Sequence, residues 1–268
     1  MKRRVAITGL GVVSPLGNDV STTWNNLIAG YSGIDSIKQF DASAFPTTIA
    51  AEVKNFSPDT SISGKHTRFI MSFTHFALEA ARQAFEDASI FPTKQTSDRW
   101  GIVTGSGMMT AEFEYLTRFQ QTCAADGEID WGKLQSNSRD FYNLVDFGKT
   151  TSNSGLSLLI QQYGITGYAS SVHTACASGG QALGLAMQVI RRGEADFMLA
   201  GGFDSMINPL GLSSFCLLGA LSTYNETPQT ASRPFDATRN GFVLGEGAAF
   251  LILEEWSKAK ARGAKIYA

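Results

Sequence analysis

The chain has 268 residues, of which 43% are hydrophobic and 17% charged, and this balance excludes an intrinsically disordered protein. Its 22 Lys and Arg residues against 24 Asp and Glu residues give a formal net charge of −2 without a run of basic residues, which argues against a general nucleic-acid partner. No uninterrupted apolar segment approaches the ~18 to 20 residues of a membrane-spanning helix, and the N-terminus lacks a secretory-signal pattern, so we expect no membrane association and a cytoplasmic location.

Short apolar runs rich in β-branched residues predict buried strands, and amphipathic patterns between them predict helices. In chain order the sequence predicts a strand at 5–11, a helix at 68–88, a strand at 101–107, a helix at 156–164, a strand at 169–175, a helix at 178–193 and strands at 196–202 and 248–255. Strands that alternate with helices indicate an α/β fold. We expect a mixed, mostly parallel sheet that is flanked by helices on both faces.

The first strand runs into "TGLGVVSPLG", where Gly9 and Gly11 suggest part of a dinucleotide-binding turn. Ser14 stands where the third glycine belongs, and Pro15 follows where a helix should begin. No second strand that ends in an acidic residue appears about 20 residues later. We therefore expect a tight strand-to-loop turn here and no nucleotide site.

Two segments in the C-terminal part of the sequence are harder to assign. The segment 222–241 is long, polar and without periodicity, and loops of that length are usually functional or disordered. Phe235, two prolines and the pair Arg233 and Asp236 favour a packed loop. At the end of the chain, a strand-like run begins at Lys265.

Cys176 lies in a setting that predicts chemistry. It stands between the strand at 169–175 and the helix at 178–193, so it occupies a sharp strand-to-helix turn. The unpaired N–H groups at a helix N-terminus carry partial positive charge, which favours a thiolate over a thiol and can stabilise an oxyanion. Small residues after the cysteine keep the approach open to a thioester. The alternative is a small buried hydrophobe, which is the commoner role of an isolated cysteine.

Other reactive residue types are weaker candidates. His173 lies three residues before Cys176 on an extended strand, where side chains alternate between faces, so we expect a buried, hydrogen-bonded histidine and no Cys-His dyad. Cys123 and Cys216 lack the strand-turn-helix setting, and we expect both to be packing residues. Three scattered cysteines do not make a disulfide framework or a metal site. Met108 fits either core packing or the wall of an apolar tunnel.

With its surroundings, "GYASSVHTACASGG" around Cys176 resembles the active-site signature of the β-ketoacyl-acyl-carrier-protein synthases, the condensing enzymes of fatty acid and polyketide synthesis. Further blocks are similar to this family and stand in family order: "VAITGLGVVSPLGN" at 5–18, "ADFMLAGGFDS" at 195–205, "ALSTYNETPQTASRPFDATRNGFVLGEGA" at 220–248 and "AKARGAKIYA" at the end. The resemblance covers essentially the whole chain and is greatest for the chain-elongating type II synthases.

This resemblance implies a thiolase-like fold of two duplicated α/β halves, assembled as a homodimer. Residues 1–255 match the first half, which carries the nucleophilic cysteine, and residues 256–268 match the start of the second, so the chain resembles a truncated synthase. The implied reaction is acylation of Cys176 from the phosphopantetheine arm of an acyl carrier protein, followed by condensation with the enolate that malonyl-carrier forms on decarboxylation. The histidines and the lysine of condensation come from the second half, and no bound cofactor is implied.

The resemblance also implies roles for four further residues. Met108 and Phe215 match positions that line the acyl pocket. Lys65 and Arg68 match basic positions that meet the acidic carrier protein, whereas charge alone indicates only a solvated face. Gly219 and Tyr224 stand where elongating synthases of the bacterial type often carry arginines, which implies weaker carrier docking or another partner.

Two functions from different classes remain. The favoured one is an acyltransferase, the cysteine-bearing part of a 3-oxoacyl synthase, which needs the C-terminal half for condensation. The rival is a non-catalytic, chain-length-determining partner subunit of a ketosynthase, whose relatives lack the nucleophilic cysteine that is present here at Cys176. A thiol hydrolase is less favoured, because it needs a base that the sequence does not place.

Overall fold

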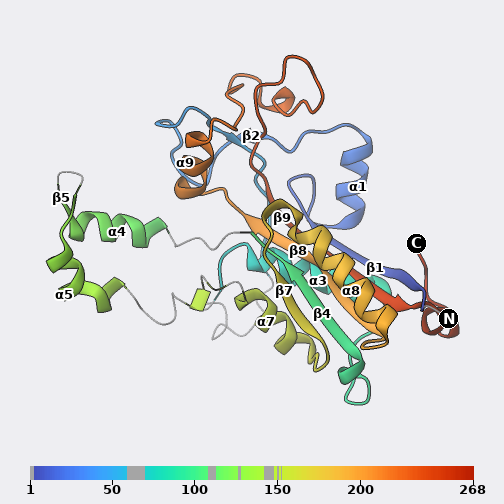
Figure 1. The fold of residues 1–268 in the computed structure, drawn as a ribbon. Coiled ribbons are helices and arrows are strands. Elements are labelled where there is room, and N and C mark those ends of the chain that lie inside the picture. The colour runs from blue at the N-terminus through green and yellow to red at the C-terminus, as the bar shows by residue number, and fades with distance from the viewer. Residues whose placement is uncertain are drawn as a thin grey trace.

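A computed structural model of the chain describes residues 3–58, 70–107, 113–125, 128–141, 148–149, 151 and 153–268. Within them, a five-stranded sheet is covered by helices on both faces, and smaller elements lie above one end of it (Figure 1). Lys65, Arg68 and Met108 fall outside the described residues.

The central sheet has the strand order β1-β9-β8-β4-β7. Its strands are β1 (Val5–Val13), β9 (Glu246–Glu255), β8 (Phe197–Ser205), β4 (Trp100–Gly105) and β7 (Ala169–Val172). The strand β9 pairs antiparallel with both β1 and β8, whereas β4 pairs parallel with both β8 and β7. Four strands therefore share one direction and β9 opposes them. All five predicted strands, and the prediction of a mixed and mostly parallel sheet, are confirmed.

The helices form a layer on each face of this sheet (Figure 1). On one face, α3 (Thr74–Ala88) and α7 (Ser154–Tyr163) enclose the larger core, in which the rings of Phe85 and Trp100 lie 5.3 Å apart. On the other face lies α8 (Ser178–Arg192). The buried apolar residues of α8 are Ala182, Ala186, Val189 and Ile190. The three predicted helices are thus present, although α3 begins at Thr74 and not at residue 68.

Gly9 and Gly11 bring β1 against α3. A Cβ at Gly11 would lie 1.8 Å from the carbonyl oxygen of Ala80, and one at Gly9 would lie 2.2 Å from that of Ala84. Ala80 and Ala84 are themselves fully buried. Both glycines lie inside the strand, so the expected strand-to-loop turn is wrong at these positions. The glycines serve helix-to-strand packing, in which any side chain would separate the two backbones.

The structure describes further helices and short strands. They are α1 (Val20–Ile28), β2 (Asp35–Ser36), β3 (Ile49–Ala50), α4 (Phe113–Cys123), β5 (Ala124–Ala125), β6 (Glu128–Ile129), α5 (Trp131–Phe141), α9 (Pro209–Leu217) and α10 (Trp256–Ala261), with 3-10 turns at Ser97–Arg99, Ala175–Ala177 and Pro228–Thr230. The elements from α4 to α5 form an arm that projects from the sheet at the left of Figure 1. None of the helices in the described ranges is long and apolar enough to cross a membrane.

The polar segment 222–241 is packed at Arg233, whose guanidinium lies 4.3 Å from the centre of the Tyr224 ring. Phe235 is different, because 99% of it is exposed and its φ of 68° is in the left-handed region. The expectation that Phe235 helps to pack this loop is therefore wrong: none of the described residues covers its ring.

The C-terminal run follows the outer edge of β1. The N–H of Ile7 donates to the carbonyl of Ala268 at 3.0 Å, and the N–H of Tyr267 donates to the carbonyl of Ile7 at 2.9 Å. No regular strand forms there, so the strand-like run predicted from Lys265 is present only as this edge contact.

Candidate active site

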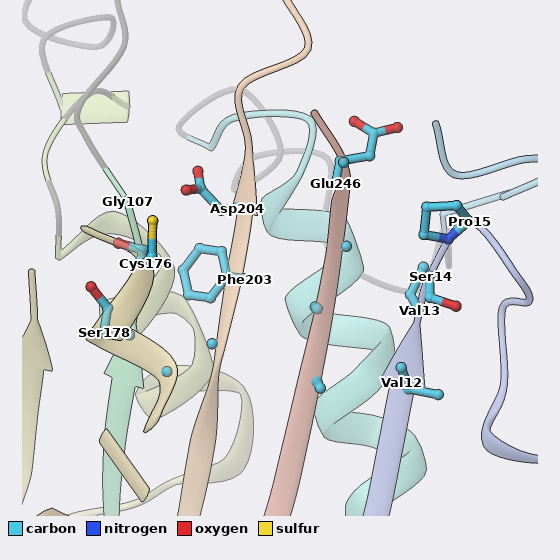
Figure 2. Close-up of a pocket in the computed structure, with 18 of the residues that line it drawn as sticks. Val12, Val13, Ser14, Pro15, Gly107, Cys176, Ser178, Phe203, Asp204 and Glu246 are labelled. Atoms are coloured by element: carbon cyan, nitrogen blue, oxygen red, sulfur yellow. The ribbon is translucent and has the colours of Figure 1, made fainter. Parts of the chain in front are cut away.

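A cavity of about 510 Å³ opens where the carboxyl ends of β4 and β8 meet the first turn of α8 (Figure 2). Cys176 lies on its wall. The other lining residues are Val12, Val13, Ser14, Pro15, Gly105, Ser106, Gly107, Ala175, Ser178, Gly179, Gly202, Phe203, Asp204 and the run 245–249. The cavity is therefore built from segments that are far apart in the sequence.

Cys176 occupies the predicted strand-to-helix turn. The strand β7 ends at Val172, a 3-10 turn spans Ala175–Ala177, and α8 begins at Ser178. Cys176 is exposed, whereas Cys123 is fully buried and Cys216 is half-buried beside an apolar cluster. A small buried hydrophobe is thus the wrong description of Cys176 and an apt one of Cys123.

Glycines seat the first turn of α8 directly on the sheet. A Cβ at Gly105 would lie 2.5 Å from the carbonyl carbon of Ser178, and one at Gly202 would lie 3.3 Å from the Cα of Gly179. Because neither strand carries a side chain at this point, the helix backbone rests against the strand ends. This contact fixes the height of the turn that carries Cys176 above the sheet.

Two carboxyl groups share the cavity with Cys176. Burial raises the pKa of the Asp204 carboxyl, and a hydrogen bond from the backbone of Ser205 partly offsets this. Burial also raises the pKa of Glu246, which accepts hydrogen bonds from the hydroxyl of Ser205 at 2.7 Å and from the N–H of Val53 at 2.9 Å. Among the described residues that line this cavity, none is His, Lys or Arg. The ionisable groups of this described lining are therefore a thiol and two carboxyls.

Asp204 and Glu246 are functional candidates that the structure adds to those predicted from the sequence. Each lies at the cavity end of a strand and beside glycines, in "AGGFDS" and "LGEGA". An acidic residue among glycines at a strand end is the signal that would have found them. Asp204 packs over Gly107 so closely that a Cβ there would lie 1.9 Å from its Oδ2.

His173 is hydrogen-bonded, as predicted, but exposed and not buried. Its Nε2 lies 2.7 Å from the hydroxyl of Ser171, and its Nδ1 lies 3.4 Å from the carbonyl of Gly107. The prediction of burial is wrong because β7 is the outer strand of the sheet, so its end faces solvent. His173 does not line the cavity of Cys176.

Phe215 lies on α9, half-buried, and packs edge-to-face against Phe242 with ring centres 5.6 Å apart. It is not among the residues that line the Cys176 cavity, so the described residues do not bring the two together. Lys65, Arg68 and Met108 have no described positions, and their roles stay predictions. Within the described part of the chain, no three His, Cys, Asp or Glu side chains converge as metal ligands.

Comparisons with known proteins agree with this architecture. The family model described as "Beta-ketoacyl synthase, N-terminal domain" matches residues 2–259. A 3-oxoacyl-[acyl-carrier-protein] synthase 2 of Coxiella burnetii is 41% identical over all of this chain, which spans 61% of that relative's length.

Two solved structures share the fold. A beta-ketoacyl synthase from Burkholderia phymatum matches 99% of this chain and 62% of its own, with a TM-score of 0.83 and 32% identity. A ketosynthase in complex with its type II PKS acyl-carrier protein matches all of this chain and 62% of its own, with a TM-score of 0.77 and 33% identity. The fold is therefore the thiolase-like ketosynthase fold, and the chain belongs to the beta-ketoacyl synthase family, of which it represents the N-terminal domain.

Proposed function

We propose that the chain is the acyl-accepting part of a 3-oxoacyl-acyl-carrier-protein synthase and that Cys176 is its nucleophile. The observation that carries this proposal is the exposed thiol in a strand-to-helix turn, on the wall of a cavity of about 510 Å³. The backbone N–H groups of such a turn suit a carbonyl oxygen that becomes negatively charged during attack on a thioester.

In the first step, the thiolate of Cys176 attacks the thioester carbon of an acyl group. A new carbon–sulfur bond forms, the carbonyl electrons return, and the phosphopantetheine sulfur leaves as a thiolate that takes up a proton. The donor is an acyl carrier protein, and its phosphopantetheine arm is the substrate handle. The carrier-bound ketosynthase among the structural relatives supports this choice of partner. No bound cofactor is needed for this exchange.

The second step joins the acyl group to malonyl-carrier. Carbon dioxide leaves the malonyl group, the resulting enolate attacks the acyl-Cys176 carbonyl, and the thiolate of Cys176 is released. The enolate oxygen needs hydrogen-bond donors or positive charge. The described cavity offers two carboxyls and no His, Lys or Arg. We therefore assign condensation to this chain together with the C-terminal part that its relatives contain.

The proposed domains match the two halves of the family fold. Residues 1–255 form the cysteine-bearing half, residues 256–268 begin the second half, and the full-length enzyme is a homodimer. The face of α8 that points away from the sheet supports a further packing partner. A Cβ at Gly180 or at Gly184 would meet nothing within 4 Å, and Leu183 and Met187 on this helix are only partly buried.

Intact-mass analysis after incubation with an acyl-carrier thioester tests the first step. We expect a mass increase equal to one acyl group, mapped to Cys176, and none in Cys176→Ala. Cys216→Ala is the matched control, because it removes a half-buried thiol outside the cavity and should acylate normally. Carrier binding without acylation of Cys176 would instead support the rival function, a non-catalytic partner subunit.

A further inference from the structure

Ser178 bridges the turn that carries Cys176. It is the first residue of α8 and is 3% exposed. Its hydroxyl accepts a hydrogen bond from the N–H of Thr174 at 2.8 Å and donates one to the carbonyl of Ala175 at 2.7 Å. One buried side chain thus joins the peptide group that leads into Thr174 to the peptide group that leads into Cys176.

The bridged turn is conformationally demanding. Ala175 has a φ of 52°, in the left-handed region that residues with a Cβ avoid. The N–H of Ser178 also donates to the carbonyl of Ala175, and the N–H of Ala177 donates to the carbonyl of Thr174. The hydroxyl of Ser178 therefore supplements a short set of backbone bonds that hold Ala175 in a disfavoured conformation.

Ser178 is itself held in place from the sheet side. The backbone of β4 at Gly105 approaches so closely that a Cβ there would lie 2.5 Å from the carbonyl carbon of Ser178. The backbone of Ser178 is consequently fixed against β4, and this fixes the position from which its hydroxyl binds the turn. Hydrogen bonds of this kind also occur in ordinary helix caps. Here, however, they lie on both sides of a strained residue next to the nucleophile, which indicates a role in holding that residue's conformation.

We propose that Ser178 is a positioning residue: by holding Ala175 in the left-handed conformation, it keeps the thiol of Cys176 at the cavity. This inference rests on the proposed function, since it assumes that Cys176 is the nucleophile. Without the hydroxyl, Ala175 relaxes toward negative φ and the peptide that leads into Cys176 rotates. The thiol then leaves the geometry in which it reacts, although the fold around it persists.

The test measures the rate at which iodoacetamide alkylates Cys176, a reaction in which the sulfur–carbon bond forms and iodide leaves. The rate is measured over a pH range around ~8.5, the pKa of a free thiol. Acyl transfer from an acyl-pantetheine thioester is measured in parallel. Ser178→Ala removes both hydrogen bonds at nearly constant volume. Ser213→Ala is the matched control, because that hydroxyl also donates to a backbone carbonyl at 2.7 Å, on α9 and outside the cavity.

We expect Ser178→Ala to slow both reactions about tenfold, the order expected when two hydrogen bonds that orient a reactive group are lost, and to shift the pH midpoint of alkylation. Ser213→Ala should change neither. Glycine adopts a positive φ without strain. In an Ala175→Gly background, Ser178→Ala should therefore slow Cys176 less than about twofold.

The outcomes are distinguishable. If wild-type Cys176 is neither alkylated selectively nor acylated, the proposed function fails. A folded Ser178→Ala protein with wild-type rates and pH midpoint overturns the positioning role alone, and so does an equal loss with and without the Ala175→Gly change. If Ser178→Ala does not fold, the double variant decides: recovery of folding and of Cys176 reactivity supports the proposal, and an unfolded or unreactive double variant refutes it.

Discussion

Asp196, directly before β8, forms ion pairs with three basic side chains. Arg3 lies 2.9 Å, Arg99 3.0 Å and Lys258 3.4 Å from its oxygens, and its side chain is 7% exposed. Burial by itself would raise the pKa of Asp196, but hydrogen bonds from Arg99 and Arg3 outweigh it and lower the value from 3.8 to about 2. The ionised form of Asp196 is therefore favoured by folding.

Replacement of Asp196 by Asn should lower the free energy of unfolding by about 2 kcal/mol at neutral pH. Since the folded pKa is depressed, this contribution is complete above the unfolded value of 3.8 and is lost as the pH falls through about 2. Urea unfolding at several pH values measures it. Glu194→Gln removes only an exposed ion pair and should cost less than about 1 kcal/mol. A loss that persists below pH ~2 would contradict the assignment.

At this scale the sequence revealed Cys176 but not its neighbours. The strand-to-helix turn at Cys176 could be predicted because the strand before it and the helix after it each have a recognisable local pattern. The glycines around Asp204 and Glu246 mark their positions in the sequence, but their raised pKa values depend on burial that only the assembled cavity creates. The contacts of Ser178 depend on a left-handed Ala175, a conformation that nothing in "HTACAS" announces.

Among the elements, β1 and α3 depend on the absence of side chains between them. Gly11→Ala should lower the free energy of unfolding by about 3 kcal/mol, because the new methyl group would lie 1.8 Å from the carbonyl oxygen of Ala80. Gly184→Ala is the control in open space, and on a helix it should raise the free energy of unfolding by about 0.5 to 1 kcal/mol. Thermal and urea unfolding measure both. Equal effects of the two changes would refute the close packing of β1 on α3.

The strands were easier to predict than their order. Runs such as "VAITGLGVV" and "FMLAGG" announce buried strands by their β-branched and apolar content. That β9 enters the sheet between β1 and β8 is a tertiary outcome that no local pattern carries. The same holds for His173, whose exposure follows from the place of β7 at the edge.

For the whole molecule, we expect the 268-residue chain to form no condensation product from acyl-carrier and malonyl-carrier, although Cys176 becomes acylated. The described cavity lining has no His, Lys or Arg side chain that could stabilise the negative charge of the enolate oxygen. Product analysis by mass spectrometry, with and without an added C-terminal half from a family member, measures this. Product formed at an ordinary enzymatic rate by the chain alone would refute the claim that condensation needs the C-terminal half.

Phe235 offers a second test at this scale. Its ring is 99% exposed on a left-handed backbone, so Phe235→Asn should raise the free energy of unfolding of this chain by about 0.5 to 1 kcal/mol. If a C-terminal half covers the ring, the same change should weaken the complex of the two halves. Chemical unfolding and a titration of one half with the other measure the two effects. A destabilised isolated chain would show that Phe235 already has a packing role.

The pairing of β1 with β9 also bears on how the chain folds during synthesis. Val5 stands opposite Glu255, so the strand neighbour of β1 is made about 250 residues after it (255 minus 5). At roughly 5 to 20 residues per second, β1 waits about 10 to 50 s for β9. The contact of β1 with α3 through Gly9 and Gly11 can form much earlier, because α3 is made long before β9. A strand that already packs against a helix is protected from pairing with another nascent chain. The residues that position β1 in the finished sheet thus also shield it while the sheet is incomplete.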